Sequence, residues 1–196
     1  DQNQKTPLLL KLLEQTRVGS VLVFTRTKHR AKRLSERLGR AGYKTASLQG
    51  NLSQNRRKDA IDGFRKGTYQ ILVATDIAAR GIDIANVSHV INYDIPNTAD
   101  AYIHRIGRTG RAARNGDAFT MVTEADDQIV KAIDRVIGFK IERRRLPDFN
   151  YGTAAEITEL GMVAQKQVPK QGGKARVNPS RPGKQRRHRK AGLIAR

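Results

Sequence analysis

Short apolar runs alternate with amphipathic stretches through the first 145 residues of the chain. The apolar runs predict five short strands, at residues 21–24, 45–48, 71–74, 89–92 and 118–122. Apolar positions at helical spacing predict helices over 8–13, 27–42, 53–67 and 124–137, and a shorter helix from about residue 99. Thr27 and Ser53 are suited to cap two of these helices. The chain therefore alternates between strand and helix.

The order of these elements predicts the fold class. Strands without polar alternation, separated by helices, indicate a parallel sheet covered on both faces. Right-handed crossovers then give a doubly wound α/β domain, in which function lies at the carboxyl ends of the strands. The segments just past the five strands are Thr25-Arg26-Thr27, Gln49-Gly50-Asn51, Thr75-Asp76, Tyr93-Asp94 and Thr123-Glu124. We expect the site at the first three.

Composition narrows the class of partner. The chain has 196 residues, with 38 Lys and Arg against 18 Asp and Glu, so its net charge is +20. Such a surplus indicates a polyanionic partner, either nucleic acid or an anionic membrane surface. The absence of cysteine excludes disulfides, Cys metal sites and thiol catalysis. No apolar run reaches membrane-spanning length and no signal-peptide pattern is visible, so we expect a cytoplasmic protein; the missing initial Met suggests an excised fragment.

The basic surplus is concentrated toward the C-terminus. After Glu159 the chain contains eleven Lys and Arg residues and no acid, and after Tyr151 it contains no Phe, Tyr or Trp. Such segments cannot bury enough apolar surface to offset chain entropy. We therefore predict one domain over residues 1–147 and a mostly disordered basic tail over residues 148–196.

An arginine and glycine segment, His104-Arg105-Ile106-Gly107-Arg108-Thr109-Gly110-Arg111, carries the most chemical information. Its three arginines recur every third residue, which would place them roughly on one side of a helix. The glycines indicate that the helix ends there and that the backbone approaches a ligand. Arginine binds phosphate oxygens in a bidentate manner, so the segment is suited to a triphosphate. A solvated basic helix end is the alternative interpretation.

Two further segments offer phosphate-binding chemistry. The segment 74–83 pairs Arg80 with the bare backbone of Gly81 and ends at Asp83, an acid that can accept from a ribose hydroxyl. Asp76 and Gly81 can alternatively be the N-cap and C-cap of one helical turn. In the segment 48–57, Gln54 and Arg57 lie one turn apart at the start of a helix, although capping by Ser53 explains that pattern equally well.

The ordered motifs VLVFTRT, LQGNLSQNRR, ILVATDIAARGID, VINYDIP and HRIGRTGRAARNG resemble the second RecA-like domain of a DEAD-box ATP-dependent RNA helicase. The resemblance covers roughly residues 5–145 and implies a RecA-like, P-loop NTPase-type sheet. The basic tail and Gly50-Asn51 are similar to the bacterial RhlE-like group. Two positions depart from the family pattern, since Gln49 stands where many members have His, and Ala113 where many have Gly.

The resemblance implies roles for individual residues. Arg108 and Arg111 would act on the ATP γ-phosphate as arginine fingers, and Asp83 would bind the ribose. Arg105 and His104 would organise the catalytic cleft and link it to the partner domain. Contacts to the RNA backbone would come from a set of strand-end and helix-start residues, with Phe24 supporting the groove: Thr25, Gln54, Arg57, Thr75, Arg80 and Gly81.

The chain lacks the motifs of the other half of such an enzyme. It contains no GxxxxGK[ST] phosphate loop and no Asp-Glu-Ala-Asp string. The family places these motifs, and with them most of the binding of ATP and Mg²⁺, on a first RecA-like domain that would precede Asp1. We therefore expect this fragment to be inactive alone and to have no metal site of its own. The expected partners are RNA and that N-terminal domain of the same protein, with ribosome or RNA-decay components as further candidates; the chain is expected to be a monomer that binds no membrane.

Two hypotheses remain from different classes. The first is the C-terminal lobe of an RNA-dependent ATPase that unwinds RNA duplexes locally. The second is a stand-alone basic module that binds or anneals RNA without catalysis, with its affinity in the tail. A basic ribosome-associated protein leaves the arginine and glycine segment unexplained, and a membrane-surface protein would need an amphipathic apolar face that the tail lacks.

Overall fold

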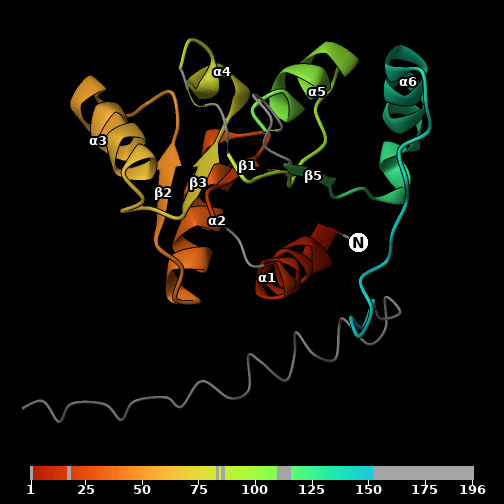
Figure 1. Cartoon of the computed structure of the whole chain (residues 1–196), viewed down its shortest axis with the longest axis horizontal. Coiled ribbons are helices and arrows are strands. Elements are labelled where there is room, and N and C mark those ends of the chain that lie inside the picture. The colour runs from red at the N-terminus through yellow and green to blue at the C-terminus, as the bar shows by residue number, and fades with distance from the viewer. Residues whose placement is uncertain (1, 17–18, 83, 85–86, 110–115, 152–196) are drawn as a thin grey trace, which may run out of the picture. The chain divides into compact units, whose positions relative to one another are not determined.

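A computed structural model describes residues 2–16, 19–82, 84, 87–109 and 116–151. These residues form one five-stranded sheet in the order β2-β3-β1-β4-β5, in which all neighbouring strands are parallel. The strands are β1 (Val21–Phe24), β2 (Thr45–Leu48), β3 (Ile71–Ala74), β4 (His89–Asn92) and β5 (Asp117–Thr120). The helices are α1 (Lys5–Gln15), α2 (Lys28–Arg40), α3 (Gln54–Arg65), α4 (Asp76–Ala79), α5 (Ala99–Ile106) and α6 (Asp127–Ile137), with 3₁₀ turns at Gln2–Gln4 and Glu124–Asp126 (Figure 1).

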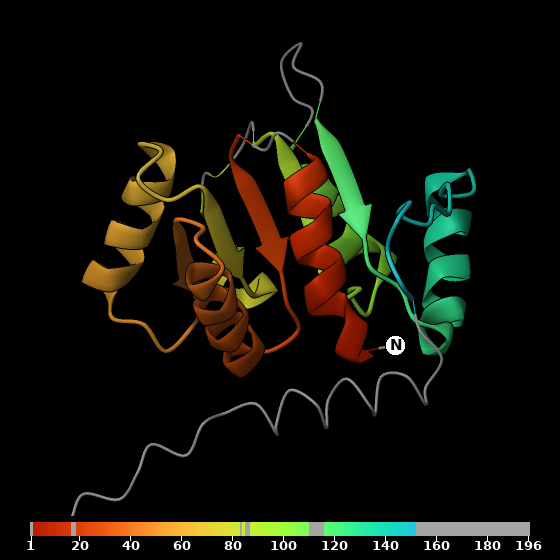
Figure 2. The same cartoon turned by 90° about the horizontal axis from the view of Figure 1, so that it is seen from below.

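Helices cover both faces of the sheet, as the apolar runs predict. Val21 and Val23 of β1 lie in one core cluster with residues of α1 and α2. Leu22 and Phe24, which point to the other face, lie in a second cluster with residues of α3 and α4. Figure 2 shows α1 and α2 side by side in front of the sheet. The doubly wound α/β prediction is therefore confirmed.

A third cluster joins the last two helices. Tyr102 of α5 packs with Val130 and Ile133 of α6, together with Ile95. This packing fixes α5 beside the sheet, and the segment that follows α5 pairs with the residues just before β4, through a bridge between Val87 and Thr109. None of the helices in the described ranges combines the length and apolar character needed to cross a membrane.

The carboxyl ends of the strands are in register. One row of paired residues crosses the sheet at its carboxyl edge, formed by Leu48, Ala74, Phe24, Asn92 and Thr120. The residues after this row extend the pairing, because the Thr25 N–H donates to the Ala74 carbonyl and the Met121 N–H donates to the Asn92 carbonyl. Segments distant in the sequence are thereby brought to one edge.

The structure corrects some element boundaries. The first helix begins at Lys5 rather than at residue 8, because Lys5 and Thr6 are polar residues buried where an apolar pattern cannot reveal them. β5 covers Asp117–Thr120 rather than 118–122, and its first two residues are exposed because it is an edge strand. The predicted tail over 148–196 is described only as far as Tyr151, so that domain boundary stays a prediction.

Candidate functional site

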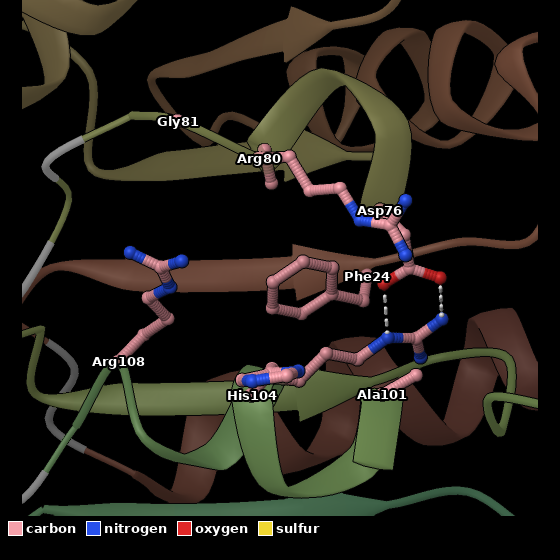
Figure 3. A pocket seen from close by; sticks show the side chains of 9 residues that line it. Phe24, Asp76, Arg80, Gly81, Ala101, His104 and Arg108 are labelled. Carbon is pink, nitrogen blue, oxygen red and sulfur yellow. Dashed lines mark hydrogen bonds and ion pairs between the residues drawn. The ribbon is translucent and has the colours of Figure 1, made fainter. Parts of the chain in front are cut away.

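A pocket of about 400 Å³ lies at the carboxyl edge of the sheet, between the end of β1 and the helices α4 and α5 (Figure 3). Three segments that are distant in the sequence meet there. Its lining consists of Phe24, Asp76, Ala79, Arg80, Gly81, Ala101, His104, Arg105 and Arg108. Four of these side chains are the cationic or ionisable ones that the sequence predicts for a site, namely Arg80, His104, Arg105 and Arg108. The pocket therefore joins the arginine and glycine segment to the segment that follows β3.

Arg105 forms the floor of the pocket. Its side chain is 3% exposed, and its Nε and Nη2 donate to the two carboxylate oxygens of Asp76, both at 2.7 Å. Its Nη1 donates to Asn92 Oδ1 at 3.0 Å and to the Asp94 carbonyl at 2.7 Å. The guanidinium carbon also lies 4.9 Å from the ring centroid of Phe24. Arg105 thus fastens α5 to the ends of β1, β3 and β4.

These contacts make Arg105 a positioning residue in the described structure. It donates four hydrogen bonds to other parts of the protein, so few donors remain for a ligand. The predicted role in organising the cleft is consistent with this geometry. This geometry does not support a direct contact between Arg105 and the reacting phosphate.

Asp94 extends the network beyond the pocket. Its carboxylate, which is 2% exposed, accepts from the Arg26 backbone N–H at 2.9 Å and pairs with Arg30 Nη1. The Asp94 backbone carbonyl in turn accepts from Arg105. The start of α2 is therefore tied to the end of β4 and, through it, to the pocket floor.

Arg108 joins the two most informative sequence segments. Its Nη1 donates to the Ile82 carbonyl at 3.0 Å, and the backbone of residue 108 accepts from the Val87 N–H at 3.2 Å. The hydroxyl of Thr109 donates to the Val87 carbonyl at 2.6 Å. α5 ends at Ile106 with Gly107 as its C-cap, as the glycines predict. Asp83 and Arg111, the predicted ribose and phosphate residues, lie outside the described residues.

The pocket has the chemistry of an anion site. The Arg105 charge is neutralised by Asp76, whereas Arg108 is half-buried and has one side-chain hydrogen bond within the described part of the chain. His104 and Arg80 are exposed at the rim (Figure 3). A guanidinium with unused donors beside a second exposed cation suits phosphate oxygens.

The predicted RNA-contacting residues divide into exposed and buried ones. Gln54, Arg80 and Gly81 are exposed, and Gly81 has the positive φ of 70° that glycine accommodates. Arg57 is half-buried, and its Nη2 donates to the Ala78 carbonyl at 3.2 Å, which joins the start of α3 to α4. These four residues lie on neighbouring elements.

Two of the residues expected to contact RNA are covered in this structure, and one capping interpretation is wrong. Thr25 is fully buried, and its hydroxyl donates to the Thr27 and Ala74 carbonyls, so its side chain supports the strand end and does not face a ligand. Thr75, at 8% exposure, is also largely covered. The interpretation of Asp76 as an N-cap is wrong as well, because Thr75 is the N-cap of α4 and the Asp76 carboxylate binds Arg105.

Sequence reasoning missed Asn92 and Asp94. Both lie at the end of β4, a strand end outside the three at which the sequence predicts the site. The available signal was a polar residue, Asn92, closing an otherwise apolar strand, followed two positions later by an acid. A buried polar side chain at a strand end requires a partner, and a buried arginine supplies it.

The five-stranded parallel α/β sheet with a cationic pocket next to the end of β1 is the architecture expected of a RecA-like domain. Comparison with known families gives the same class, because the model described as "Helicase conserved C-terminal domain" matches residues 4–113. The chain belongs to this family, as the C-terminal RecA-like domain of a DEAD-box RNA helicase.

Individual relatives support this assignment. The DEAD-box ATP-dependent RNA helicase 28 of Arabidopsis thaliana is 45% identical over 148 residues, covering 76% of this chain and 19% of that protein. The structure of the E. coli DEAD-box protein SrmB, solved bound to regulator of ribonuclease activity A, is 39% identical with a TM-score of 0.71, covering 78% of this chain and 92% of that one. The C-terminal domain of the DEAD-box protein Dbp5 is 36% identical with a TM-score of 0.67, covering 84% and 91%. This chain spans less than a third of the length of the curated relatives that it matches.

Proposed function

We propose that this chain is the C-terminal lobe of an ATP-dependent RNA helicase, in which it supplies an arginine finger and RNA-backbone contacts for RNA-stimulated ATP hydrolysis. The observation that carries the proposal is the hydrogen bond from Arg108 to the Ile82 carbonyl. This contact places the guanidinium of one motif against the backbone of the other, in a pocket that extends from the carboxyl end of β1.

The described residues fit the phosphate end of ATP. Arg108 makes one side-chain hydrogen bond to the described residues, which leaves it donors for a ligand, while Asp76 holds the neighbouring Arg105 away from a ligand. In this role Arg108 would stabilise the negative charge that develops on the transferred phosphoryl group, with Arg111 as a second finger and Asp83 at the ribose. Mg²⁺, which neutralises phosphate charge when bound, would be held mainly by the first RecA-like domain.

The residues that the resemblance assigns to RNA suit contacts with its backbone. Gln54, Arg57 and Arg80 present amide and guanidinium groups, and Gly81 presents bare backbone. Such contacts are made to phosphate and sugar, so sequence preference is expected to be slight. RNA and ATP would each bridge the two lobes, and each would favour the closed state, which couples hydrolysis to RNA binding.

The finger role is tested by Arg108→Ala in the full-length protein that contains both RecA-like domains. Finger arginines contribute about 10³–10⁵ in rate in related phosphoryl transfer, so turnover should fall by at least about 10³. RNA affinity should change little, since Arg108 is not among the RNA-contacting residues. Steady-state ATP hydrolysis and RNA binding are measured on the same preparation.

A matched control is Arg135→Ala, which removes an exposed arginine of α6. This variant should hydrolyse ATP at the wild-type rate. Near-normal hydrolysis by Arg108→Ala would remove the finger assignment, and an equal loss in both variants would show that the effect is not specific to the pocket.

The C-terminal residues favour a second, compatible activity as an RNA tether. Eleven basic residues and no acid follow Glu159. Each phosphate contact steepens the salt dependence of binding by about 0.7 log unit on single strands. Deletion of residues 148–196 should therefore make the RNA affinity less dependent on salt. The slope of log affinity against log salt concentration should become shallower by several units. An unchanged slope would exclude the tail as the main contact.

A further inference from the structure

The outward side of α2 carries a dense row of basic side chains. Six of the thirteen residues of this helix are Lys or Arg, and one is acidic. Within it, His29, Arg33, Arg37 and Arg40 recur at spacings of four, four and three, which places them on one face of the helix. All four are exposed, while Ala31, Leu34 and Leu38 are buried against the sheet. We refer to these four residues as the α2 row.

Little of the positive charge of the α2 row is neutralised, whereas Arg30, elsewhere on the helix, pairs with Asp94. The one acid of the helix, Glu36, lies 3.9 Å from Lys32 in an exposed pair, which is a weak interaction. Arg37 Nη1 donates to the Thr6 hydroxyl at 3.3 Å, a contact that leaves its charge in place. Across the described residues, Arg33 and Arg40 make no ion pair. An ordinary solvated helix face mixes charges of both signs, as α6 does with Asp127 and Lys131.

The α2 row is separate from the pocket and from the predicted RNA contacts. α2 covers the same sheet face as α1 (Figure 2), whereas α3 and α4, which carry Gln54, Arg57 and Arg80, pack against the opposite face. α2 nevertheless starts at the carboxyl edge, where Thr27 caps it three residues after Phe24. From there the helix runs back toward the amino edge, because β1 and β2 are both parallel members of the sheet.

We propose that the α2 row is a second contact surface for the RNA backbone, which receives RNA outside the cleft. This inference rests on the proposed function, in which RNA binds at the carboxyl edge of the sheet. Successive members of the row are separated by about 6, 6 and 4.5 Å along the helix axis. Phosphates of one strand recur about every 3.4 Å of helix axis, so flexible arginines can each reach one. Arginine binds phosphate in a bidentate manner and without regard to base, so the contact is sequence-independent.

The test uses the complete 196-residue chain and two sets of charge-neutralising changes. The first variant, called the α2 variant, is Arg33→Gln/Arg40→Gln/Lys44→Gln. It changes two members of the α2 row and Lys44, an exposed residue of the turn between α2 and β2, and it leaves Arg37 and its hydrogen bond to Thr6 intact. The matched control is Lys66→Gln/Arg135→Gln/Lys140→Gln, which removes the same charge from exposed positions outside α2. Glutamine has a helix propensity close to that of Lys and Arg, so both variants should retain the fold, as checked by circular dichroism.

The readout is the affinity for a single-stranded RNA oligonucleotide as a function of salt. We expect the α2 variant to bind more weakly and its log–log slope to fall by about 2, because each phosphate that a cation neutralises adds about 0.7 to the slope. The control should change the slope by less than about 0.7. Equal slopes in the two variants, with RNA still bound, would overturn the α2 proposal alone. Failure of the wild-type chain to bind RNA would overturn the proposed function with it.

A second measurement uses only the wild-type chain, so its result does not depend on whether a variant folds. Lysines are acetylated in the presence and absence of the RNA and quantified by mass spectrometry. Three exposed lysines lie close to the α2 row in the chain, namely Lys28 and Lys32 in the same helix and Lys44 in the turn after it. RNA should protect these α2-side lysines several-fold, and should leave Lys66 and Lys140 unprotected. Equal reactivity of the three α2-side lysines with and without RNA would contradict the proposal. So would their protection by phosphatidylglycerol vesicles alone, because that result assigns the surface to a membrane.

Discussion

At the scale of single residues, Arg105 shows how an arginine in the arginine and glycine segment can serve the structure. It is buried, it forms a two-oxygen fork with Asp76, and it donates to groups at the end of β4. Its neighbour Arg108, three residues later, has one side-chain hydrogen bond within the described residues. The fork holds Arg105, and with it the last turn of α5, in place; His104 of this turn and Arg108, which follows the Gly107 C-cap, line the pocket.

Asp76→Asn tests this positioning role. The change leaves the buried guanidinium without its carboxylate, and breaking such a pair typically costs about 3–5 kcal/mol. Because the Asp76 side chain is 36% exposed, solvent compensates part of this cost, and we expect the free energy of unfolding to fall by about 2–3 kcal/mol. Urea denaturation of the chain measures this difference.

The control for that change is Asp59→Asn on the exposed side of α3, which should stay within about 0.5 kcal/mol of the wild type. Equal effects of the two changes would mean that the fork contributes nothing. Arg105→Lys should also destabilise the chain, because an ammonium keeps the charge but cannot form the fork.

At the scale of elements, α1 is fixed to the carboxyl edge by polar side chains. Lys5 is 4% exposed and lies 3.9 Å from the Asp126 carboxylate, and the Thr6 hydroxyl is hydrogen-bonded to the Tyr93 hydroxyl at 2.9 Å. Burial lowers the pKa of Lys5 below its ordinary value of 10.5, and the nearby carboxylates of Asp126 and Asp94 only partly oppose this shift. The charged amine therefore destabilises the folded state at neutral pH.

Lys5→Met should raise the free energy of unfolding at pH 7 by about 1 kcal/mol, since Asp126 keeps its hydrogen bonds from Thr123. Between the lowered pKa and 10.5 the folded chain binds fewer protons than the unfolded one, so wild-type stability rises with pH. The advantage of methionine should therefore shrink as pH approaches 10.5.

Denaturation at pH 7 and at pH 10 measures this trend, with the exposed Lys11→Met as the control that should show no such trend. An advantage for Lys5→Met that is independent of pH, or a constant destabilisation, would show that Lys5 is not held in an unfavourable charged state.

Most elements, but fewer site contacts, could be predicted from the sequence. The central strands β1, β3 and β4 were predictable because buried parallel strands are largely apolar runs, and capping by Thr27 and Ser53 marked the starts of α2 and α3. The observed bounds of β5 differ from the predicted ones because this edge strand is partly exposed and its apolar pattern is weaker. The network of Asp76, Asn92 and Asp94 around Arg105 could not be predicted, since it depends on which strand ends become neighbours in the order β2-β3-β1-β4-β5.

At the scale of the whole molecule, the chain has the features expected of half of a two-lobe ATPase. It provides a cationic pocket at the carboxyl edge of a parallel sheet, and its sequence contains neither a phosphate loop nor a DEAD string. Its net charge of +20 would speed association with RNA, and this effect should weaken as salt rises. Catalysis would then depend on closure with a second lobe, since the arginines reach the phosphates only in that state.

The most direct test measures RNA-dependent ATP hydrolysis by this chain alone and after fusion, through a flexible linker, to the first RecA-like domain of a DEAD-box helicase. The linker keeps the two lobes at a high effective concentration. We predict no hydrolysis by the chain alone, and RNA-stimulated hydrolysis by the fusion that Arg108→Ala abolishes. ATP hydrolysis by the isolated chain, or a fusion no more active than the first domain by itself, would contradict the assignment.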